Sequence, residues 1–197
     1  MKEFWDDRFG SEDYVYGTDP NVFFKEQLDK LEPGKLLLPA EGEGRNAVYA
    51  ASKGWEVTAV DFSEIARKKA LRLADRNNVQ IDYSLMDLRY LRCRNGFDAI
   101  GLVFIHFRPE QRTAFHHHLH DCLNKGGIII AEFFHKRQLE NKTGGPPAVE
   151  MLYDEKELRE DFRSLRIDLI KEKKIHMAEG SYHKGVADVV RLVAVKD

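Results

Sequence analysis

The sequence has little of several features that mark special classes of protein. Only Cys93 and Cys122 are cysteines, which is too few for a disulfide framework or a thiolate metal site. No apolar run approaches the roughly 20 residues that a membrane-spanning helix needs. The first residues also lack the charged and then apolar pattern of a secretion signal. We therefore expect a cytoplasmic protein.

Neither sign of charge dominates the chain. The sequence has 31 basic and 33 acidic residues, a net charge of −2 and no basic stripe. This balance argues weakly against nucleic acid as the main partner. The 197 residues, 43% of them hydrophobic, fit a single domain with one substantial core. The oligomeric state is left open.

The sequence does contain an alternation of short apolar runs with helix-forming segments. Apolar runs bounded by glycine, proline or polar residues predict buried strands. The first five predicted strands are 36–38, 55–60, 79–83, 97–104 and 128–131. The predicted helices between or before them are 21–31, 45–53, a helix that opens at 63 and one over 109–123, which Gly126 and Gly127 end. This alternation favours right-handed βαβ units and a parallel sheet.

The last third of the chain has a different pattern. Asp154 and Glu157 form a capping box for a helix to about Ser164. Strand-like stretches follow at 165–175 and 186–195, and a short polar connection with glycine favours an antiparallel hairpin between them. We therefore predict a doubly wound, Rossmann-like α/β fold whose mostly parallel sheet ends in an antiparallel carboxyl-terminal hairpin.

A glycine-containing loop follows the first predicted strand, and acidic residues follow the next two. Gly42 and Gly44 allow a tight turn and close approach of a ligand. Asp61, which closes the second strand, can accept hydrogen bonds from both ribose hydroxyls of an adenosine ligand. Asp87, after the third strand, can reach an adenine amino group. Together these positions indicate an adenosine-containing cofactor at the carboxyl edge of the sheet.

Two kinds of cofactor fit this pattern. Gly42, Gly44 and Ala47 also satisfy the dinucleotide-binding fingerprint, so an NAD(P)-dependent oxidoreductase of Rossmann type is the alternative. Against it, Glu41 and Glu43 place negative charge where a pyrophosphate would lie, whereas the cationic end of S-adenosylmethionine tolerates that charge. A nucleotide-binding regulatory module without catalysis is a third class.

Five stretches of the chain, two of which contain the glycine loop and Asp61, resemble a known family. They are Phe4–Phe9, Tyr14–Pro20, Ala40–Asn46, Val60–Ser63 and Lys142–Pro146. In these stretches the chain resembles the class I S-adenosylmethionine-dependent methyltransferases, and within them the tellurite-resistance and thiopurine methyltransferase-like group. That family has a seven-stranded sheet with a reversed final hairpin. The resemblance implies methyl transfer to a small-molecule acceptor, for example a thiol or a chalcogen nucleophile.

The resemblance also implies roles for residues at the sheet edge. The loop of Gly42 and Gly44 would hold the methionine portion of S-adenosylmethionine, Asp61 the ribose and Asp87 the adenine. The other cofactor contacts that it implies are Phe62 and Leu88 at the adenine, Val103 and Phe104 at the methionine, and Tyr16, Ala40, Glu41, Arg45 and Asn46.

This sequence departs from the family in the glycine loop. The acidic residue and the first glycine of the family correspond here to Leu38 and Ala40, so that Glu41 becomes the candidate partner of the cofactor ammonium.

The predicted domain spans 1–197 and has four parts. These are an N-terminal helical lid segment at 1–31, a cofactor-binding core at 35–133, a substrate loop at 134–153, and a carboxyl-terminal helix and hairpin at 154–197. The substrate loop is longer than most connections within a domain and leaves the edge where ligands bind. We expect Phe134 and Tyr153 at its ends, together with Tyr14, to line the substrate pocket.

Histidine is the natural group to take a proton from an alcohol or amine acceptor. His106, just after the fourth predicted strand, is the candidate catalytic residue. His116 and His120 share a helix face, but no acidic third ligand is in register with them. We therefore predict no metal site.

Overall fold

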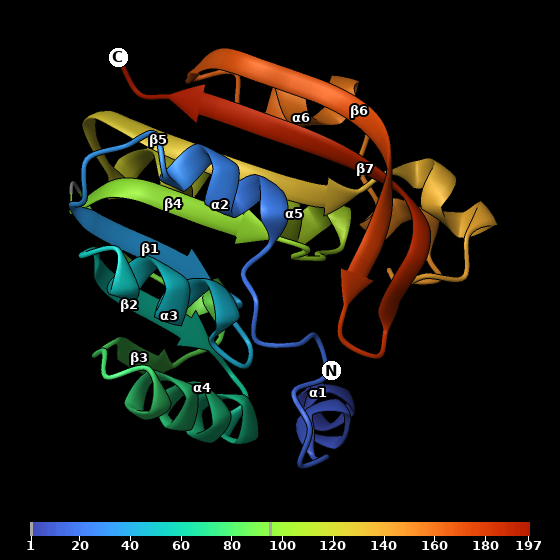
Figure 1. The fold of residues 1–197 in the computed structure, drawn as a ribbon. Coiled ribbons are helices and arrows are strands. Elements are labelled where there is room, and N and C mark those ends of the chain that lie inside the picture. Colours follow the sequence, from blue (N-terminus) through green and yellow to red (C-terminus); the bar gives the residue numbers. More distant parts are fainter. Residues whose placement is uncertain (1, 95) are drawn as a thin grey trace.

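The computed structural model describes residues 2–94 and 96–197 and contains the predicted α/β fold (Figure 1). One seven-stranded sheet has the strand order β3-β2-β1-β4-β5-β7-β6. The strands are β1 (Lys35–Pro39), β2 (Glu56–Asp61), β3 (Asp82–Leu85), β4 (Phe97–Val103), β5 (Leu123–Phe134), β6 (Arg166–Glu179) and β7 (His183–Val195). The helices are α1 (Lys2–Phe9), α2 (Val22–Leu28), α3 (Arg45–Ser52), α4 (Glu64–Arg76), α5 (Pro109–Cys122) and α6 (Glu155–Asp161), with short 3-10 turns η1 (Leu88–Tyr90), η2 (Lys136–Glu140) and η3 (Val149–Met151).

Strand directions confirm the predicted mixture of parallel and antiparallel pairing. The first five strands, β1 to β5, pair only in parallel with one another, whereas β7 pairs antiparallel with both β5 and β6. Helices cover both faces of the parallel part, which is why its strands are apolar on both sides. Leu36 and Leu38 pack with Phe24 of α2 on one face, while Leu37 packs with Leu119 of α5 on the other.

Two predicted boundaries are wrong. Gly126 and Gly127 do not separate α5 from β5, because the helix already ends at Cys122 and both glycines lie within β5. Gly126 has a φ of 78°, and the β4–β5 register shifts beside it, so these glycines form an irregularity at the beginning of a strand. The third strand begins at Asp82 rather than at residue 79.

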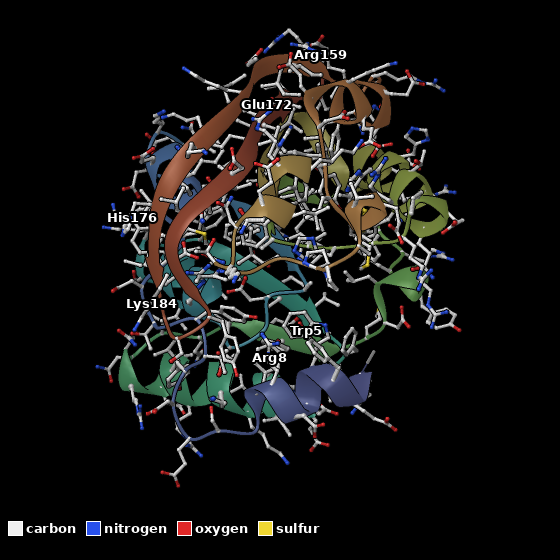
Figure 2. The ribbon with its side chains drawn as sticks, turned by 90° about the vertical axis from the view of Figure 1, so that its right-hand side faces the viewer. Trp5, Arg8, Arg159, Glu172, His176 and Lys184 are labelled. Atoms are coloured by element: carbon white, nitrogen blue, oxygen red, sulfur yellow. A yellow bond between two sulfur atoms is a disulfide. The ribbon has the colours of Figure 1, made fainter. Side chains whose placement is uncertain are left out.

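The terminal hairpin is longer than its apolar pattern predicts. β6 continues to Glu179 and β7 begins at His183, so only 180–182 connect the two strands. Figure 2 shows the hairpin, with Glu172 and His176 on β6 and Lys184 near the turn, extending toward Trp5 and Arg8 of α1. The guanidinium carbon of Arg8 lies 4.0 Å from the ring centre of Tyr182, and Ser181 N–H donates to the carbonyl of Val15 at 2.9 Å. The hairpin turn therefore lies beside the N-terminal segment.

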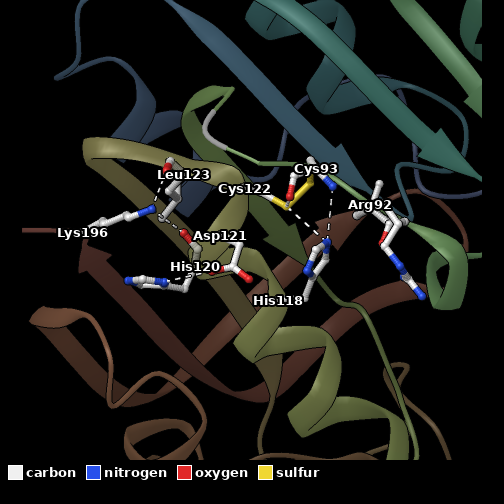
Figure 3. Close-up of a disulfide and its surroundings, with 9 residues drawn as sticks. Arg92, Cys93, His118, His120, Asp121, Cys122, Leu123 and Lys196 are labelled. Carbon is white, nitrogen blue, oxygen red and sulfur yellow. Dashed lines mark hydrogen bonds and ion pairs between the residues drawn. A yellow bond between two sulfur atoms is a disulfide. The ribbon is translucent and has the colours of Figure 1, made fainter.

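The two cysteines form one disulfide bond between Cys93 and Cys122 (Figure 3). The low cysteine count excluded a framework of several bridges, but it could not exclude a single pair. Cys122 is fully buried in the core beside Leu119, as its small apolar character predicts. Among the described residues, no helix is both long and apolar enough to cross a membrane.

Candidate active site

The carboxyl ends of β1, β2 and β4 bring most of the predicted cofactor residues to one edge of the sheet. Pro39 pairs with Val60, so the loop after β1 and Asp61 at the end of β2 lie side by side. On the other side of β1, the end of β4 carries Val103 and then Phe104. Ligands of open α/β sheets bind at this edge, where the strand order reverses.

The glycine loop has the backbone conformation that its sequence predicts. Gly42 and Gly44 have φ values of 63° and 89°, in the left-handed region. Ala40, which stands where the resembling family has glycine, has a φ of 51°. A side chain in this conformation costs about 1 kcal/mol or more, and such strain is typical of ligand-binding loops.

Asp61 holds this loop from the neighbouring strand. Gly42 N–H donates to Oδ2 of Asp61 at 3.0 Å, and Ser63 N–H donates to Oδ1 at 2.9 Å. Burial raises the pKa of Asp61, although both backbone N–H groups oppose that shift. The carboxylate is therefore fixed beside the loop, and each oxygen keeps a lone pair that can accept from a ribose hydroxyl.

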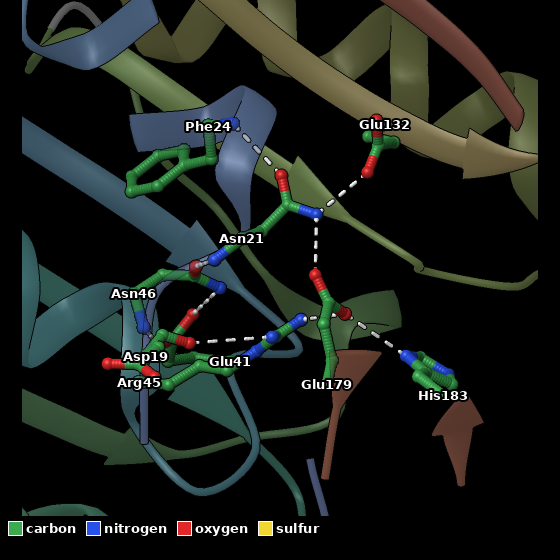
Figure 4. Close-up of polar contacts among 9 residues, drawn as sticks. All are labelled: Asp19, Asn21, Phe24, Glu41, Arg45, Asn46, Glu132, Glu179 and His183. Carbon is green, nitrogen blue, oxygen red and sulfur yellow. Dashed lines mark hydrogen bonds and ion pairs between the residues drawn. The ribbon is translucent and has the colours of Figure 1, made fainter. Parts of the chain in front are cut away.

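Glu41 caps α3 from within the same loop. Its Oε1 accepts from the backbone N–H of Asn46 at 2.8 Å, a residue drawn beside Glu41 in Figure 4, and from the backbone N–H of Ala47 at 2.7 Å. Burial raises the pKa of Glu41 to about 7, against the hydrogen bonds from Ala47 and the charge of Arg45. Near neutral pH this carboxyl group is consequently close to half ionised.

The pKa of Glu41 predicts a pH-dependent stability. Because folding raises this pKa above its ordinary value, the stabilisation is complete below about pH 4.5 and is lost as the pH rises through about 7. Glu41→Gln, which stays uncharged, should gain stability relative to the wild type between pH 5 and pH 8. Urea unfolding at both pH values measures this gap, with the exposed Glu56→Gln as control. If Glu41→Gln instead lost stability relative to the wild type between pH 5 and pH 8, the raised pKa of Glu41 would be contradicted.

A second buried polar cluster joins the hairpin to the glycine loop. Glu179, the last residue of β6, accepts from Nη2 of Arg45 at 2.9 Å and lies 3.2 Å from Nδ1 of His183 (Figure 4). Asn21 Nδ2 donates to Glu179 at 3.2 Å and to Glu132 of β5 at 2.7 Å. Strands far from β1 in the sheet thus contribute charged groups beside the first residue of α3.

Glu179 and His183 in this cluster both have a pKa below the ordinary value of the group. Burial alone would raise the pKa of Glu179, but the hydrogen bond with His183 and the charge of Arg45 outweigh burial and hold it at about 2. Burial also lowers the pKa of His183, against the pull of Glu179. An ionised Glu179 facing Nδ1 favours the neutral tautomer with the proton on Nδ1. The lone pair of Nε2 is then available, and no described residue donates a hydrogen bond to it.

Aromatic side chains surround His183. Its ring centre lies 4.5 Å from that of Tyr16, 5.0 Å from Phe104 and 5.3 Å from Phe134. Phe104 has a φ of 51°, a second strained residue at this edge. Gly144 of the predicted substrate loop also packs on the ring, since a Cβ there would lie 3.0 Å from Nε2 of His183. The predicted residues Tyr16, Phe104 and Phe134 therefore meet at a histidine that the sequence analysis did not select.

His106 lies on the other side of Phe134, and the two ring centres are 5.8 Å apart. Its Nδ1 is 3.3 Å from the carbonyl oxygen of Met151, and burial lowers its pKa to about 4. His106 is thus neutral at physiological pH, and within 2–94 and 96–197 no carboxylate pairs with it as Glu179 does with His183.

Four predicted site residues have other partners in the structure. Tyr153 is fully buried, stacks on Phe133 and donates to the carbonyl of Ile105, so it packs in the core, as the equally buried Phe134 does. The hydroxyl of Tyr14 donates to the carbonyl of Lys69 on α4 at 2.9 Å. The remaining two are Asp87, which forms an ion pair with Arg89, and Leu88, which is buried in the core.

The histidines of α5 do not form the pair that their spacing suggested. His116 is fully buried and its Nδ1 lies 2.9 Å from Oδ2 of Asp161, which also pairs with Arg112. His120 faces Asp121 instead. The shared helix face of His116 and His120 therefore holds no common ligand position.

Sequence comparison identifies a methyltransferase domain in the part of the chain that contains this edge. The family model described as "Methyltransferase domain" matches residues 39–127. A protein of Haemophilus influenzae (strain 10810) described as "Probable S-adenosyl-L-methionine-dependent methyltransferase TehB" is 26% identical over 105 residues, which are 51% of this chain and 37% of that protein. A tRNA (uracil(54)-C(5))-methyltransferase of Pyrococcus abyssi is 28% identical over 142 residues, or 66% of this chain and 33% of that protein. The chain spans about a third of the length of each of these relatives.

Solved structures with the same fold extend over the whole chain. One, described as "Conversion of a Disulfide Bond into a Thioacetal Group during Echinomycin Biosynthesis", has a TM-score of 0.79 at 18% identity and covers 100% of this chain and 92% of its own. Magnesium protoporphyrin IX methyltransferase from Synechocystis PCC 6803 with bound SAH has a TM-score of 0.73 at 17% identity, with 100% and 98% covered. These likenesses confirm the fold.

Proposed function

The chain belongs to the class I S-adenosylmethionine-dependent methyltransferases, in the group that resembles TehB, and from this premise we propose that it methylates a small acceptor at the edge formed by the glycine loop and His183. The observation that carries the proposal is the loop of Gly42 and Gly44 held by Asp61 at the carboxyl ends of the strands. The cofactor is S-adenosylmethionine.

The residues at this edge suit the parts of that cofactor. Asp61 would accept the ribose hydroxyls, and Phe62 lies next to it for the adenine. Asp87 can reach the adenine amino group only by sharing the carboxylate that now binds Arg89. Glu41 would attract the cationic methionine end, with Ala40, Arg45 and Asn46 around it. Val103 and Phe104 would border the methyl group from the end of β4.

The protein groups near the acceptor suit methyl transfer with removal of a proton. S-adenosylmethionine would supply the methyl group, which the acceptor lone pair would displace in line from sulfur to leave S-adenosylhomocysteine. His183, oriented by Glu179, would take the acceptor proton at Nε2 and release it to solvent after transfer. Tyr16, Phe104 and Phe134 would exclude water around this step.

An acceptor screen that follows release of S-adenosylhomocysteine tests this function. It should include thiols, selenite, tellurite, thiopurines, small amines and phenols, with a tRNA substrate as a separate arm because one relative is named as a tRNA methyltransferase. We expect turnover on a small molecule with a removable proton. Turnover on tRNA alone would contradict the proposed acceptor class, and NAD-dependent reduction without any methyl transfer would favour the oxidoreductase alternative.

We also propose that the N-terminal segment and the loop over 134–153 close over bound ligands. Tyr16 packs on His183, and a Cβ at Gly144 would lie 3.0 Å from Nε2 of the same ring, so both segments already lie beside the proposed base. Amide hydrogen exchange in 14–17 and 142–147 should slow when S-adenosylhomocysteine and an acceptor are added. If the exchange rates of both segments are the same with and without ligand, the two segments do not close over it. The cytoplasmic location stays a prediction.

A further inference from the structure

A third cluster of reactive side chains lies at the end of the sheet opposite the glycine loop. Cys93 lies four positions before Phe97, the first residue of β4. His118 and Cys122 lie one turn apart near the end of α5 (Figure 3). Residues four apart on a helix project from the same face. The ligand atoms of all three side chains lie within 4.8 Å of one another.

The imidazole of His118 is oriented toward the sulfur atoms. Its Nε2 lies 3.7 Å from Sγ of Cys122, and the backbone N–H of Cys93 donates to the same nitrogen at 3.4 Å. Nε2 is therefore the unprotonated ring nitrogen in this arrangement, and its single lone pair accepts from the N–H of Cys93. A metal ion bound at Nε2 would replace this hydrogen bond at a nitrogen that already lies beside Sγ of Cys122.

From this geometry we propose that, once the disulfide is reduced, Cys93, His118 and Cys122 bind one zinc-like metal ion. Two thiolates and one imidazole are ligands that zinc prefers, and water would complete a tetrahedral set. With metal–ligand bonds of about 2.0–2.3 Å, the ligand atoms of a tetrahedral site lie roughly 3.5–3.8 Å apart. The separation of 3.7 Å between His118 and Cys122 already matches that spacing.

Disulfide and metal are alternative states of the same two sulfur atoms. Opening the disulfide takes two electrons and two protons and yields two thiols: a thiol reductant supplies both, whereas a phosphine supplies the electrons, is oxidised to its oxide, and takes the protons and oxygen from water. Binding of a divalent ion then displaces the two thiol protons. The state of this cluster would restrain the connection between η1 and β4, because Cys93 lies within it.

The test uses the full chain, reduced with a phosphine and freed of reductant without oxygen, and Co²⁺ as the probe. One Co²⁺ per chain should bind, with the visible bands of a tetrahedral site and a thiolate-to-cobalt charge-transfer band, and Zn²⁺ should displace it. His118→Ala should weaken binding by at least about tenfold. Cys93→Ser should remove the charge-transfer contribution of one sulfur.

His117→Ala is the matched control, because His117 is an exposed neighbour on the same helix. Circular dichroism checks that each variant is folded, and the partly exposed His118 serves as the main test if Cys93→Ser does not fold. A folded, fully reduced chain that binds no Co²⁺ would overturn the proposal. Equal affinity in the wild type and in His118→Ala would overturn it too. Neither result depends on methyl transfer.

Discussion

His183→Asn is expected to lower the rate of methyl transfer by roughly 10²–10⁴-fold, the usual contribution of a positioned general base. The asparagine amide can still donate to Glu179, but it cannot take a proton at the position of Nε2. Affinity for S-adenosylhomocysteine should change little, because no proposed cofactor contact comes from this side chain. The measurement is single-turnover kinetics on the acceptor that the screen identifies.

The pH dependence of this rate separates a base from a merely structural histidine. The groups that face His183 are Glu179, Arg45, Arg8, Tyr16 and His106. Since burial lowers the pKa of His183, the wild-type rate should rise with pH and level off below neutrality.

Two variants complete this test. Glu179→Gln removes the neighbour that raises the pKa of His183, and should shift the rise to lower pH. Lys184→Ala, an exposed neighbour, should leave the profile unchanged. A His183→Asn enzyme with the wild-type rate and profile would show that the acceptor reacts without this base.

Gly44→Ala is expected to destabilise the fold strongly. A Cβ at this position would lie 2.6 Å from Cβ and 2.8 Å from Cα of Ala70, so the backbone of α4 would have to move. Overpacking of this kind costs about 1–3 kcal/mol. The left-handed φ of 89° adds strain of about 1–3 kcal/mol. Together these two costs are a large part of the free energy of unfolding of an ordinary domain.

Gly126→Ala is the matched control for this prediction. Gly126 has a φ of 78°, but a Cβ there would meet no atom within 4 Å. Both variants therefore carry similar backbone strain, and only Gly44→Ala adds the clash with α4. Urea unfolding should show a larger loss of stability for Gly44→Ala. Equal losses would mean that the glycine loop does not pack tightly on α4.

The residues that the sequence predicted at the site share one property, which is their place at the ends of parallel strands. The apolar runs of β1, β2 and β4 predict these strands from the sequence. Because ligands bind at the carboxyl ends of such strands, the residues at or just after those ends are expected together: Gly42, Gly44, Asp61 and Phe104. Local sequence fixes these positions because each residue lies within a few positions of its strand.

Glu179 and His183 could not be found in the same way. The hairpin leaves the core near its turn, where polar and apolar residues mix, so the pattern predicted that Glu179 lies in a loop and left His183 outside both strands. Antiparallel pairing of β6 with β7 carries both residues back to Arg45. The one available signal was the pairing of a carboxylate and a histidine on either side of a predicted turn.

Tertiary packing also decided the outcome for Tyr153. An aromatic residue at the end of a long loop can pack on a ligand or on the core, and its sequence neighbours do not distinguish these. In the structure Tyr153 fills space between Phe133 and His116. The disulfide is a similar case, because Cys93 and Cys122 are 29 positions apart and meet only through the pairing of β4 with β5.

Calorimetry on the wild type and on Asp61→Ala tests whether the edge formed by the glycine loop and Asp61 binds S-adenosylmethionine. We expect one S-adenosylhomocysteine bound per wild-type chain and no binding of NAD. In a folded Asp61→Ala variant the affinity should be lower by about 1–3 kcal/mol, the usual loss of charge-assisted hydrogen bonds. Unchanged affinity in that variant, or binding of NAD in place of S-adenosylhomocysteine, would contradict binding of S-adenosylmethionine at this edge.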